Sequence, residues 1–449
     1  MRLSAEECRE LARRAVAMTQ ADEAEAVVAA TDSALTRFAD NRIHQNVAET
    51  DTQLSVRAVV GTRIGVASTN RLDDAGVAAC CERAVASARL APEDPEFPGL
   101  PGPEAVATPD RTSAATRAFD AEARAQAVRA IIAPSARNSL VAAGTVGVSD
   151  YAVAVANSAG VDVGMDVTDV RATVLSMGAG PGAGSGWSSF LGISAEHLEP
   201  DVLGEQAAET ALRTRDAGDL DPGSYTVLLA PDAVADLMDF LGYLGFGAKS
   251  FAEGTAFTSH HEGERLFSES LAITDDALAS EALGLTFDFE GQPKRVTPLV
   301  ESGVVRGPVT DSYYAAKLGR ENTGHALPAP NPYGPMPLNV AVAPGDTSTA
   351  SMIASVERGV YVSRFHYVNV EDPMRVVLTG MTRDGTFAIE NGRLARPLKN
   401  LRFTQSALDA LASVLAVSKE RSLVGPAEGG ATLVPALLLE RWAFTGQTG

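Results

Sequence analysis

Two stretches near the start of the chain alternate apolar and polar residues, which is the pattern of strands in a sheet. They are residues 23–46, EAEAVVAATDSALTRFADNRIHQN, and residues 49–70, ETDTQLSVRAVVGTRIGVASTN. Gly61 and Thr62 mark a hairpin turn inside the second stretch. A helical pattern follows at residues 72–91. This order of strand, strand, hairpin and helix predicts an α+β unit.

The same type of structure is expected further along the chain. Residues 92–116 are rich in Pro, Gly and acidic residues, which indicates a linker. A helical pattern at 119–133 then precedes strand patterns near 145–156 and 161–177. We therefore predict an N-terminal α+β domain, resembling an α/β sandwich, over residues 1–218.

A chain of 449 residues exceeds the usual size of one domain, so we expect a second domain over residues 219–449. Its short β-branched runs, separated by glycine turns, favour a β-rich barrel or sandwich. One amphipathic helix is predicted after Pro231, from the spacing of Val234, Leu237, Met238, Leu241 and Leu244.

Charge and cysteine content restrict the possible partners and the compartment. Lys and Arg number 37 against 57 Asp and Glu, and the net charge of −20 argues against nucleic-acid binding. The three cysteines include adjacent Cys80 and Cys81, which lack CxxC spacing and are expected at buried helix positions, with their role left open. No apolar run is long enough to span a membrane, and the first helix, at 4–18, has a Ser4–Glu7 capping box rather than a signal-peptide pattern. We expect a cytoplasmic protein.

Histidines are the candidate metal ligands. His260 and His261 are adjacent, and neighbouring residues on a strand point to opposite faces, so this pair alone is a poor zinc site. His325 and His366 are the candidates for a third ligand. We expect His366 to be an ordinary residue of an alternating strand.

A second set of candidates concerns substrate contact. His325 lies in the Pro- and Gly-rich segment NTGHALPAPNPYGP, which we expect to be a loop outside the core, able to contact a peptide together with Asn331. His261 is a third candidate for the wall of a substrate channel. No GxSxG or cysteine–histidine motif indicates a nucleophile, and we assign no catalytic role to Asp275 and Asp276.

Several segments resemble the TldD/PmbA family, also called modulators of DNA gyrase. They include TRFADNRIHQN, VRAVVGTRIGVASTN and GTAFTSHHEGERLFSESLAITDD. The most diagnostic one is GVYVSRFHYVNVEDPMRVVLTGMTRDGTFAIENG, whose GTFAIENG is similar to the PmbA/TldE branch. The resemblance extends over nearly the whole chain.

The TldD branch of that family carries HExxxH on a helix, where two histidines hold zinc and the glutamate is the general base. The matching positions here are Asp239, Phe240 and Leu244, and no HExxxH or HExxH occurs in the chain. The cysteine that the active branch carries near its C-terminus is also missing, since none follows Cys81.

The resemblance therefore implies a non-catalytic subunit without a metal of its own. It would pair with a zinc-bearing TldD-like chain, as a heterodimer or larger assembly, and form part of a chamber that cleaves unfolded or small peptides. A homodimer stays possible. Two alternatives remain open, namely a metallopeptidase with displaced ligands at His260, His261 or His366, and a regulator that binds peptides without cleaving them.

Overall fold

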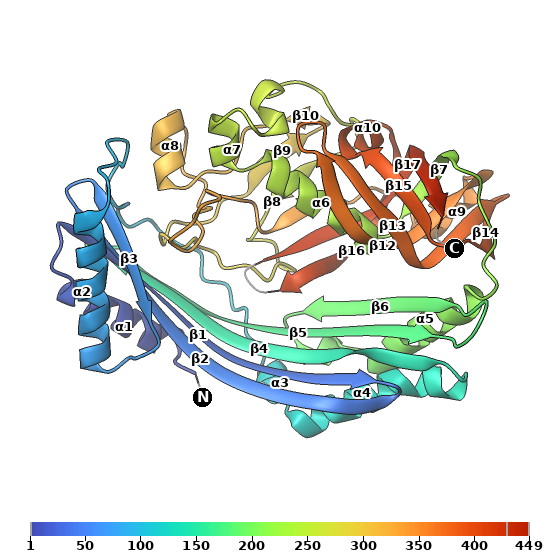
Figure 1. Cartoon of the computed structure of the whole chain (residues 1–449), viewed down its shortest axis with the longest axis horizontal. Helices are drawn as coiled ribbons and strands as arrows, with labels where there is room; N and C mark the ends of the chain where they lie inside the picture. Colours follow the sequence, from blue (N-terminus) through green and yellow to red (C-terminus); the bar gives the residue numbers. More distant parts are fainter. Residues whose placement is uncertain (1, 428–429, 448–449) are drawn as a thin grey trace.

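The first six strands form one antiparallel sheet in the order β3-β2-β1-β4-β5-β6 (Figure 1). The structure is a computed structural model, and it describes residues 2–427 and 430–447. The longest hairpin joins the first two strands through Asp40 and Asn41, whose φ angles of 50° and 58° are those of a tight hairpin turn. The strands are β1 (Glu23–Ala39), β2 (Arg42–Val60), β3 (Arg63–Thr69), β4 (Val141–Asn157), β5 (Asp162–Met177) and β6 (Ser185–Gly192).

Helices cover one face of this sheet. Because side chains alternate along a strand, Ala152, Ala154 and Ala156 of β4 lie on the helix-covered face, while Val153 and Val155 lie on the opposite face. The helices of this half are α1 (Ala5–Met18), α2 (Asp74–Leu90), α3 (Ala114–Arg117), α4 (Ala121–Arg137) and α5 (Pro200–Arg213), with the 3-10 turn η1 (Ala195–His197).

The second half closes into a barrel. Strand β7 pairs with β12 and β17, and the ring is completed through β13 and β15. The barrel is therefore closed by strands far apart in the sequence. The strands are β7 (Gly223–Leu229), β8 (Ile273–Asp275), β9 (Thr297–Glu301), β10 (Val304–Val305), β11 (Val340–Val342), β12 (Arg358–Asp372), β13 (Val377–Glu390), β14 (Arg393–Pro397), β15 (Leu401–Ser406), β16 (Val414–Ala427) and β17 (Gly430–Gln447).

Helix α6 (Pro231–Gly245) packs into the core of the barrel. Its buried residues Val234, Leu237, Met238 and Leu241 recur at helical spacing and contact the same apolar cluster as Trp442. The remaining short helices are α7 (Ala248–Ala252), η2 (Phe257–His260), α8 (Ser312–Leu318), α9 (Thr349–Ala354) and α10 (Ala407–Leu411).

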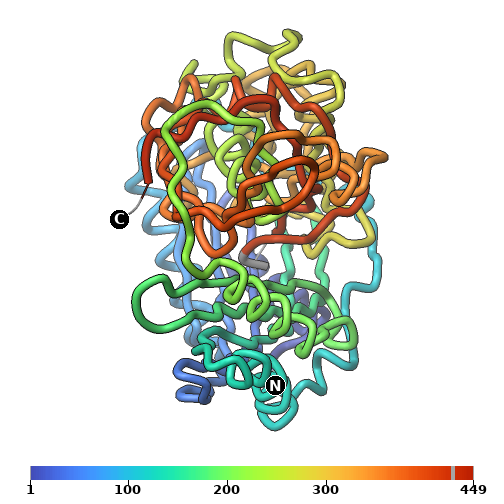
Figure 2. Tube along the Cα trace, turned by 90° about the vertical axis from the view of Figure 1, so that its right-hand side faces the viewer, coloured from blue at the N-terminus to red at the C-terminus, as the bar shows by residue number. Residues whose placement is uncertain are grey.

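The two halves are stacked, with the barrel lying over the helix-free face of the first sheet (Figures 1 and 2). At this seam Leu285 and Phe287 of the second half pack against Val153, Val155 and Val167. Both faces of β4 and β5 are thus buried, one by helices and the other by the second half.

The α+β prediction is confirmed, and the β-rich second half is a barrel rather than a sandwich. The Ser4–Glu7 capping box is present at the start of α1, and the helix expected after Pro231 is α6. Cys80 and Cys81 are buried on α2, as expected. No helix within the described residues is long and apolar enough to cross a membrane.

The seam residue Phe287 gives a test of how strongly the two halves hold each other. Its side chain is 1% exposed, so Phe287→Ala would leave a cavity and is expected to lower the free energy of unfolding by about 3–5 kcal/mol in urea denaturation. Leu278→Ala, at a side chain that is 38% exposed, is the control and is expected to change it by less than about 0.5 kcal/mol. Equal effects of the two changes would mean that the seam does not contribute to stability.

Candidate functional site

A cleft lies between strands β1 to β3 of the first sheet and residues 326–334 of the second half. It consists of two adjoining cavities of about 540 and 610 Å³ that share Arg57, Val66, Ala329 and Pro330. Strands β1 to β3 form one wall, and Asp311, Tyr313, Tyr314 and Asn331 line the other. The cleft therefore joins both halves of the molecule.

Arg57 forms ion pairs with two carboxylates in the walls of the cleft. Arg57 Nη2 of β2 donates to Glu25 Oε2 of β1 at 2.8 Å and to Glu290 Oε1 of the second half at 3.1 Å. Burial raises the pKa of Glu25 to about 7, although Arg57 acts in the opposite direction. Arg57 thus links the two halves and partly compensates the negative charge of Glu25 and Glu290.

Asp311 and Asn331 complete the polar wall. Burial and the neighbouring Glu290 raise the pKa of Asp311 to about 6. Asn331 Nδ2 donates to the Gly334 carbonyl at 2.8 Å, and its Oδ1 accepts from the Tyr333 amide at 2.8 Å. The Asn331 side chain thus stabilises the conformation of its own loop, and the residue also lines the cleft.

The expectation that His325 lies outside the core is wrong, because its side chain is fully buried. Its Nδ1 lies 2.9 Å from Thr323 Oγ1, and its Nε2 lies 3.0 Å from Asp275 Oδ1. The chain folds this way because Asp275 sits on β8, in the middle of the second half, where its other oxygen accepts from the Leu338 and Asn339 amides at 2.8 Å. His325 therefore does not reach a substrate in the cleft.

Protonation in this group follows from its surroundings. Burial and nearby Lys294 lower the pKa of His325, although Asp275 acts in the opposite direction. Burial alone would raise the pKa of Asp275, but His325, Lys294 and the Asn339 amide outweigh it and hold that pKa well below its usual range. His325 Nε2 and Asp275 Oδ1 face each other at 3.0 Å, but neither atom has a hydrogen-bond partner of good geometry. Thr323, His325 and Asp275 have the order of a catalytic triad, but their burial makes the group structural.

The displaced-ligand candidates do not come together. His260 is exposed at the end of η2, His261 Nδ1 contacts Glu264 Oε2 at 2.8 Å, and His366 lies on β12 near Arg364 and Arg383. Across residues 2–427 and 430–447, no three His, Cys, Asp or Glu side chains are grouped as a metal site.

Zinc does not fit the matching part of α6. Phe240 and Leu244 pack against the apolar core, and Asp239 Oδ1 accepts from Thr432 Oγ1 at 2.8 Å. One carboxylate without nitrogen or sulfur donors beside it lacks the three protein ligands of a catalytic zinc site.

Helix α6 carries instead a row of acids, Asp232, Asp236 and Asp239, of which sequence inspection singled out only Asp239. Asp232 accepts from Trp187 Nε1 and Ser189 Oγ of β6, both at 3.3 Å, so the row faces the first sheet. Burial, with repulsion from Asp239 and Asp232, raises the pKa of Asp236 to about 7. Desolvation also raises the pKa of Asp239, although the hydrogen bond from Thr432 acts in the opposite direction.

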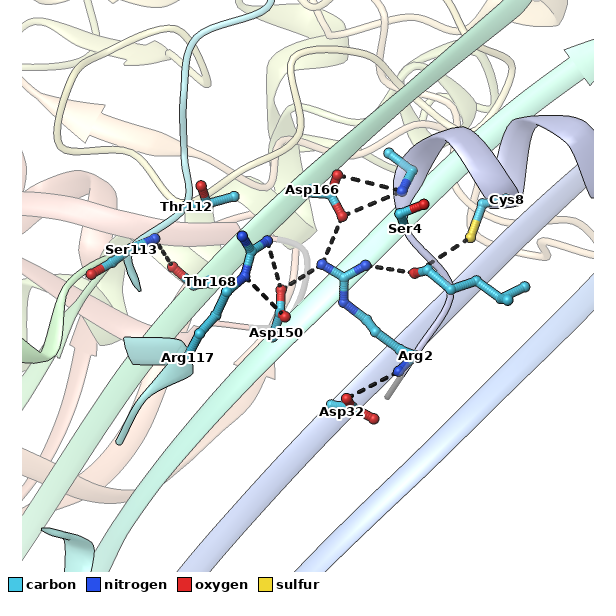
Figure 3. A network of polar contacts seen from close by, with 12 residues as sticks. Arg2, Ser4, Cys8, Asp32, Thr112, Ser113, Arg117, Asp150, Asp166 and Thr168 are labelled. Atoms are coloured by element: carbon cyan, nitrogen blue, oxygen red, sulfur yellow. Dashed lines mark hydrogen bonds and ion pairs between the residues drawn. The ribbon is translucent and has the colours of Figure 1, made fainter. Parts of the chain in front are cut away.

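A third cavity, of about 780 Å³, lies on the helix-covered face beside α1 and α3. Figure 3 shows its ion network, in which Arg2 contacts Asp150 and Asp166 while Arg117 contacts Asp150. These ion pairs attach Arg2, which precedes α1, and Arg117, the last residue of α3, to strands β4 and β5.

Comparison with known proteins gives matches over most of the chain. Residues 222–446 match the PmbA/TldA metallopeptidase C-terminal domain, residues 96–215 match the central domain, and residues 24–88 match domain 1 of the same family. The structure is similar to TldE from Thermococcus kodakarensis, with a TM-score of 0.89 and 20% identity over 97% of this chain and 99% of the other. It is also similar to a putative modulator of DNA gyrase from Thermotoga maritima, with a TM-score of 0.86 and 19% identity over the same shares.

Among sequences, a protein named metalloprotease from Methanothermobacter thermautotrophicus is 26% identical over 230 residues, which are 50% of this chain and 49% of that protein. The chain thus spans about half the length of the curated relatives it matches.

The buried Asp275 group gives the first prediction for this region. Asp275→Asn is expected to lower the free energy of unfolding by about 3–5 kcal/mol, because Lys294 loses a buried counter-charge. The folded-state pKa of Asp275 is depressed, so its contribution is present above its unfolded pKa near 4 and is lost only as the pH falls through the folded value. The difference measured by urea unfolding should be the same at pH 7 and pH 5.5. Glu269→Gln, at an exposed carboxylate, is the control, and an equally small effect of Asp275→Asn would contradict the assignment.

The acid row predicts the opposite pH dependence. The pKa of Asp236 is raised, so the folded protein binds an extra proton between about pH 4 and pH 7 and loses stability as the pH rises through that window. Asp236→Asn should therefore raise the free energy of unfolding at pH 8 by about 1–2 kcal/mol, after allowance for screening by solvent, and leave it unchanged at pH 4. A gain of equal size at both pH values would show that ionisation of Asp236 is not the cause.

Proposed function

The chain belongs to the PmbA/TldA metallopeptidase family, and from this premise we propose that it is a non-catalytic, TldE-type subunit of a peptidase. Its partner would be a TldD-type chain that carries zinc and cleaves unfolded or small peptides. This chain would contribute part of the substrate chamber.

The observation that carries the proposal is the composition of α6. Asp239, Phe240 and Leu244 stand where the resemblance to the active branch places its zinc ligands and general base, and two of the three side chains pack into the core. The fold around them is complete, with a closed barrel and a covered sheet. A preserved fold whose described part groups no set of metal ligands favours a supporting role over independent catalysis.

The cleft supports a role in holding peptide. Strand β3 is the edge strand of the first sheet, and its residues Ile64 and Val66 line the cavity of about 610 Å³. An extended peptide can add to such an edge by main-chain hydrogen bonds and place alternate side chains in the cavity. Asp311 and Glu290, on the opposite wall, favour peptides with positive charge near that point.

The test compares the full chain alone with the full chain purified together with a TldD-type chain. Metal content by mass spectrometry and hydrolysis of an unstructured peptide are measured on both samples. We expect stoichiometric zinc and chelator-sensitive cleavage only in the mixed sample, because the described residues of this chain group no set of donors for zinc.

The control is a mixed sample whose TldD-type chain has lost the glutamate of HExxxH, and it should bind zinc without cleaving. Stoichiometric zinc and cleavage by this chain alone would contradict the proposal and favour displaced ligands at His260, His261 or His366. Peptide binding without any cleavage in the mixed sample would favour a regulator.

A further inference from the structure

Arg124 is a buried arginine whose hydrogen bonds go only to neutral oxygens. It lies on α4 and is 4% exposed. Its Nε donates to Thr36 Oγ1 at 3.3 Å, its Nη1 to the Phe119 carbonyl at 2.9 Å and its Nη2 to Asn46 Oδ1 at 3.2 Å. Burial lowers the pKa of Arg124, and the charge of Asp120 acts in the opposite direction. Buried charges in proteins are usually paired, so a guanidinium without a carboxylate partner calls for an explanation.

The guanidinium of Arg124 has donors to spare. Arginine carries five N–H groups, one on Nε and two on each terminal nitrogen. The three hydrogen bonds use one N–H each, so Nη1 and Nη2 both keep an N–H without an acceptor in the part of the chain that the structure describes. Arginine binds the two oxygens of a carboxylate through a pair of such donors. Arg124 therefore offers the hydrogen bonds of a carboxylate site.

Space for a ligand lies beside Arg124, in the cavity of about 780 Å³ that it lines. Small-molecule sites are cavities of about 300–1,000 Å³. Ala34 of β1 lies on the same face of the sheet as Thr36, and it pairs with Ala48 of β2 and Val148 of β4. All three line the cavity, so small apolar side chains form its floor next to the guanidinium.

The other two arginines of the cavity are already paired. Arg2 contacts Asp150 and Asp166, and Arg117 contacts Asp150 (Figure 3). Among the three lining arginines, Arg124 is thus the one that forms no ion pair within residues 2–427 and 430–447. A carboxylate that enters the cavity is expected to bind there.

The acids of the cavity restrict the class of ligand. Six carboxylates and three arginines line it, and the acids are Glu7, Asp32, Glu49, Asp120, Asp150 and Asp166. Glu49 and Asp120 are exposed. A ligand with several negative charges would be repelled by this surface, whereas one that carries a single carboxylate and an ammonium group complements both kinds of charge. Amino acids and short peptides have this combination, and the volume favours a short peptide.

We propose that this cavity binds a short peptide, whose terminal carboxylate is held by Arg124 and whose ammonium group lies toward Glu49 and Asp120. The site is on the helix-covered face of the first sheet, whereas the cleft described earlier lies between the two halves. The inference does not rest on the proposed peptidase role, and its test measures binding rather than cleavage.

The test is isothermal titration calorimetry on the full chain at pH 7, with trialanine as the probe. We expect saturable binding of one equivalent. Trialanine amide, which lacks the carboxylate, should bind at least about tenfold more weakly, because hydrogen bonds to a charged group are lost. Arg124→Gln should weaken the binding of trialanine by a similar factor. Ala34→Phe, which fills the floor and leaves Arg124 in place, should also weaken it.

The matched control is Arg129→Gln, which removes the same charge from an exposed position on the same helix and should bind trialanine like the unmodified chain. Circular dichroism checks that each variant keeps the fold. Absence of binding, equal binding of the amide, or unchanged binding by both Arg124→Gln and Ala34→Phe would overturn the proposal. Tighter binding of inorganic phosphate than of trialanine would overturn the assigned class of ligand.

Discussion

The structure depends on burial of the helix-free face of the first sheet. Val153, Val155 and Val167 form an apolar surface that no helix covers, and Leu285 and Phe287 of the second half cover it. This apolar contact holds the two halves together. The segment around Leu285 and Phe287 leaves part of strands β1 to β3 uncovered. The cleft lies there, and polar side chains such as Glu25 and Arg57 line it.

Charge is distributed around that contact in two different ways. Arg57, shared by Glu25 and Glu290, gives the cleft wall a partly compensated charge. On α6, Asp232 and Asp239 accept hydrogen bonds, and Arg364 offsets only part of the burial that raises the pKa of Asp232 and Asp236. Deeper in the second half, Asp275 is compensated by backbone amides, Lys294 and His325. The chain thus compensates Asp275 in its interior, while burial raises the pKa of Glu25, Asp236 and Asp311 elsewhere.

Much of the fold could be predicted from the sequence, because short-range patterns encode it. The alternation in residues 23–70, the capping box at Ser4 and the spacing on α6 each predicted an element that the structure contains. The site was less predictable. Proline and glycine around His325 indicated an exposed loop, yet the segment packs inward because its polar atoms find partners on β8 and at Thr323. Such pairs are far apart in the sequence, and no local pattern marks them.

The closed barrel has a consequence for biosynthesis. Strand β7 is made long before its neighbours β12 and β17, so the ring cannot close until the segment around Phe444 has left the ribosome. The first sheet can form much earlier, with its valine surface still uncovered. Long-range strand pairing is slow, so this interval is when the nascent chain is most exposed to aggregation. We therefore expect the growing polypeptide to depend on chaperones chiefly between completion of β6 and completion of β17.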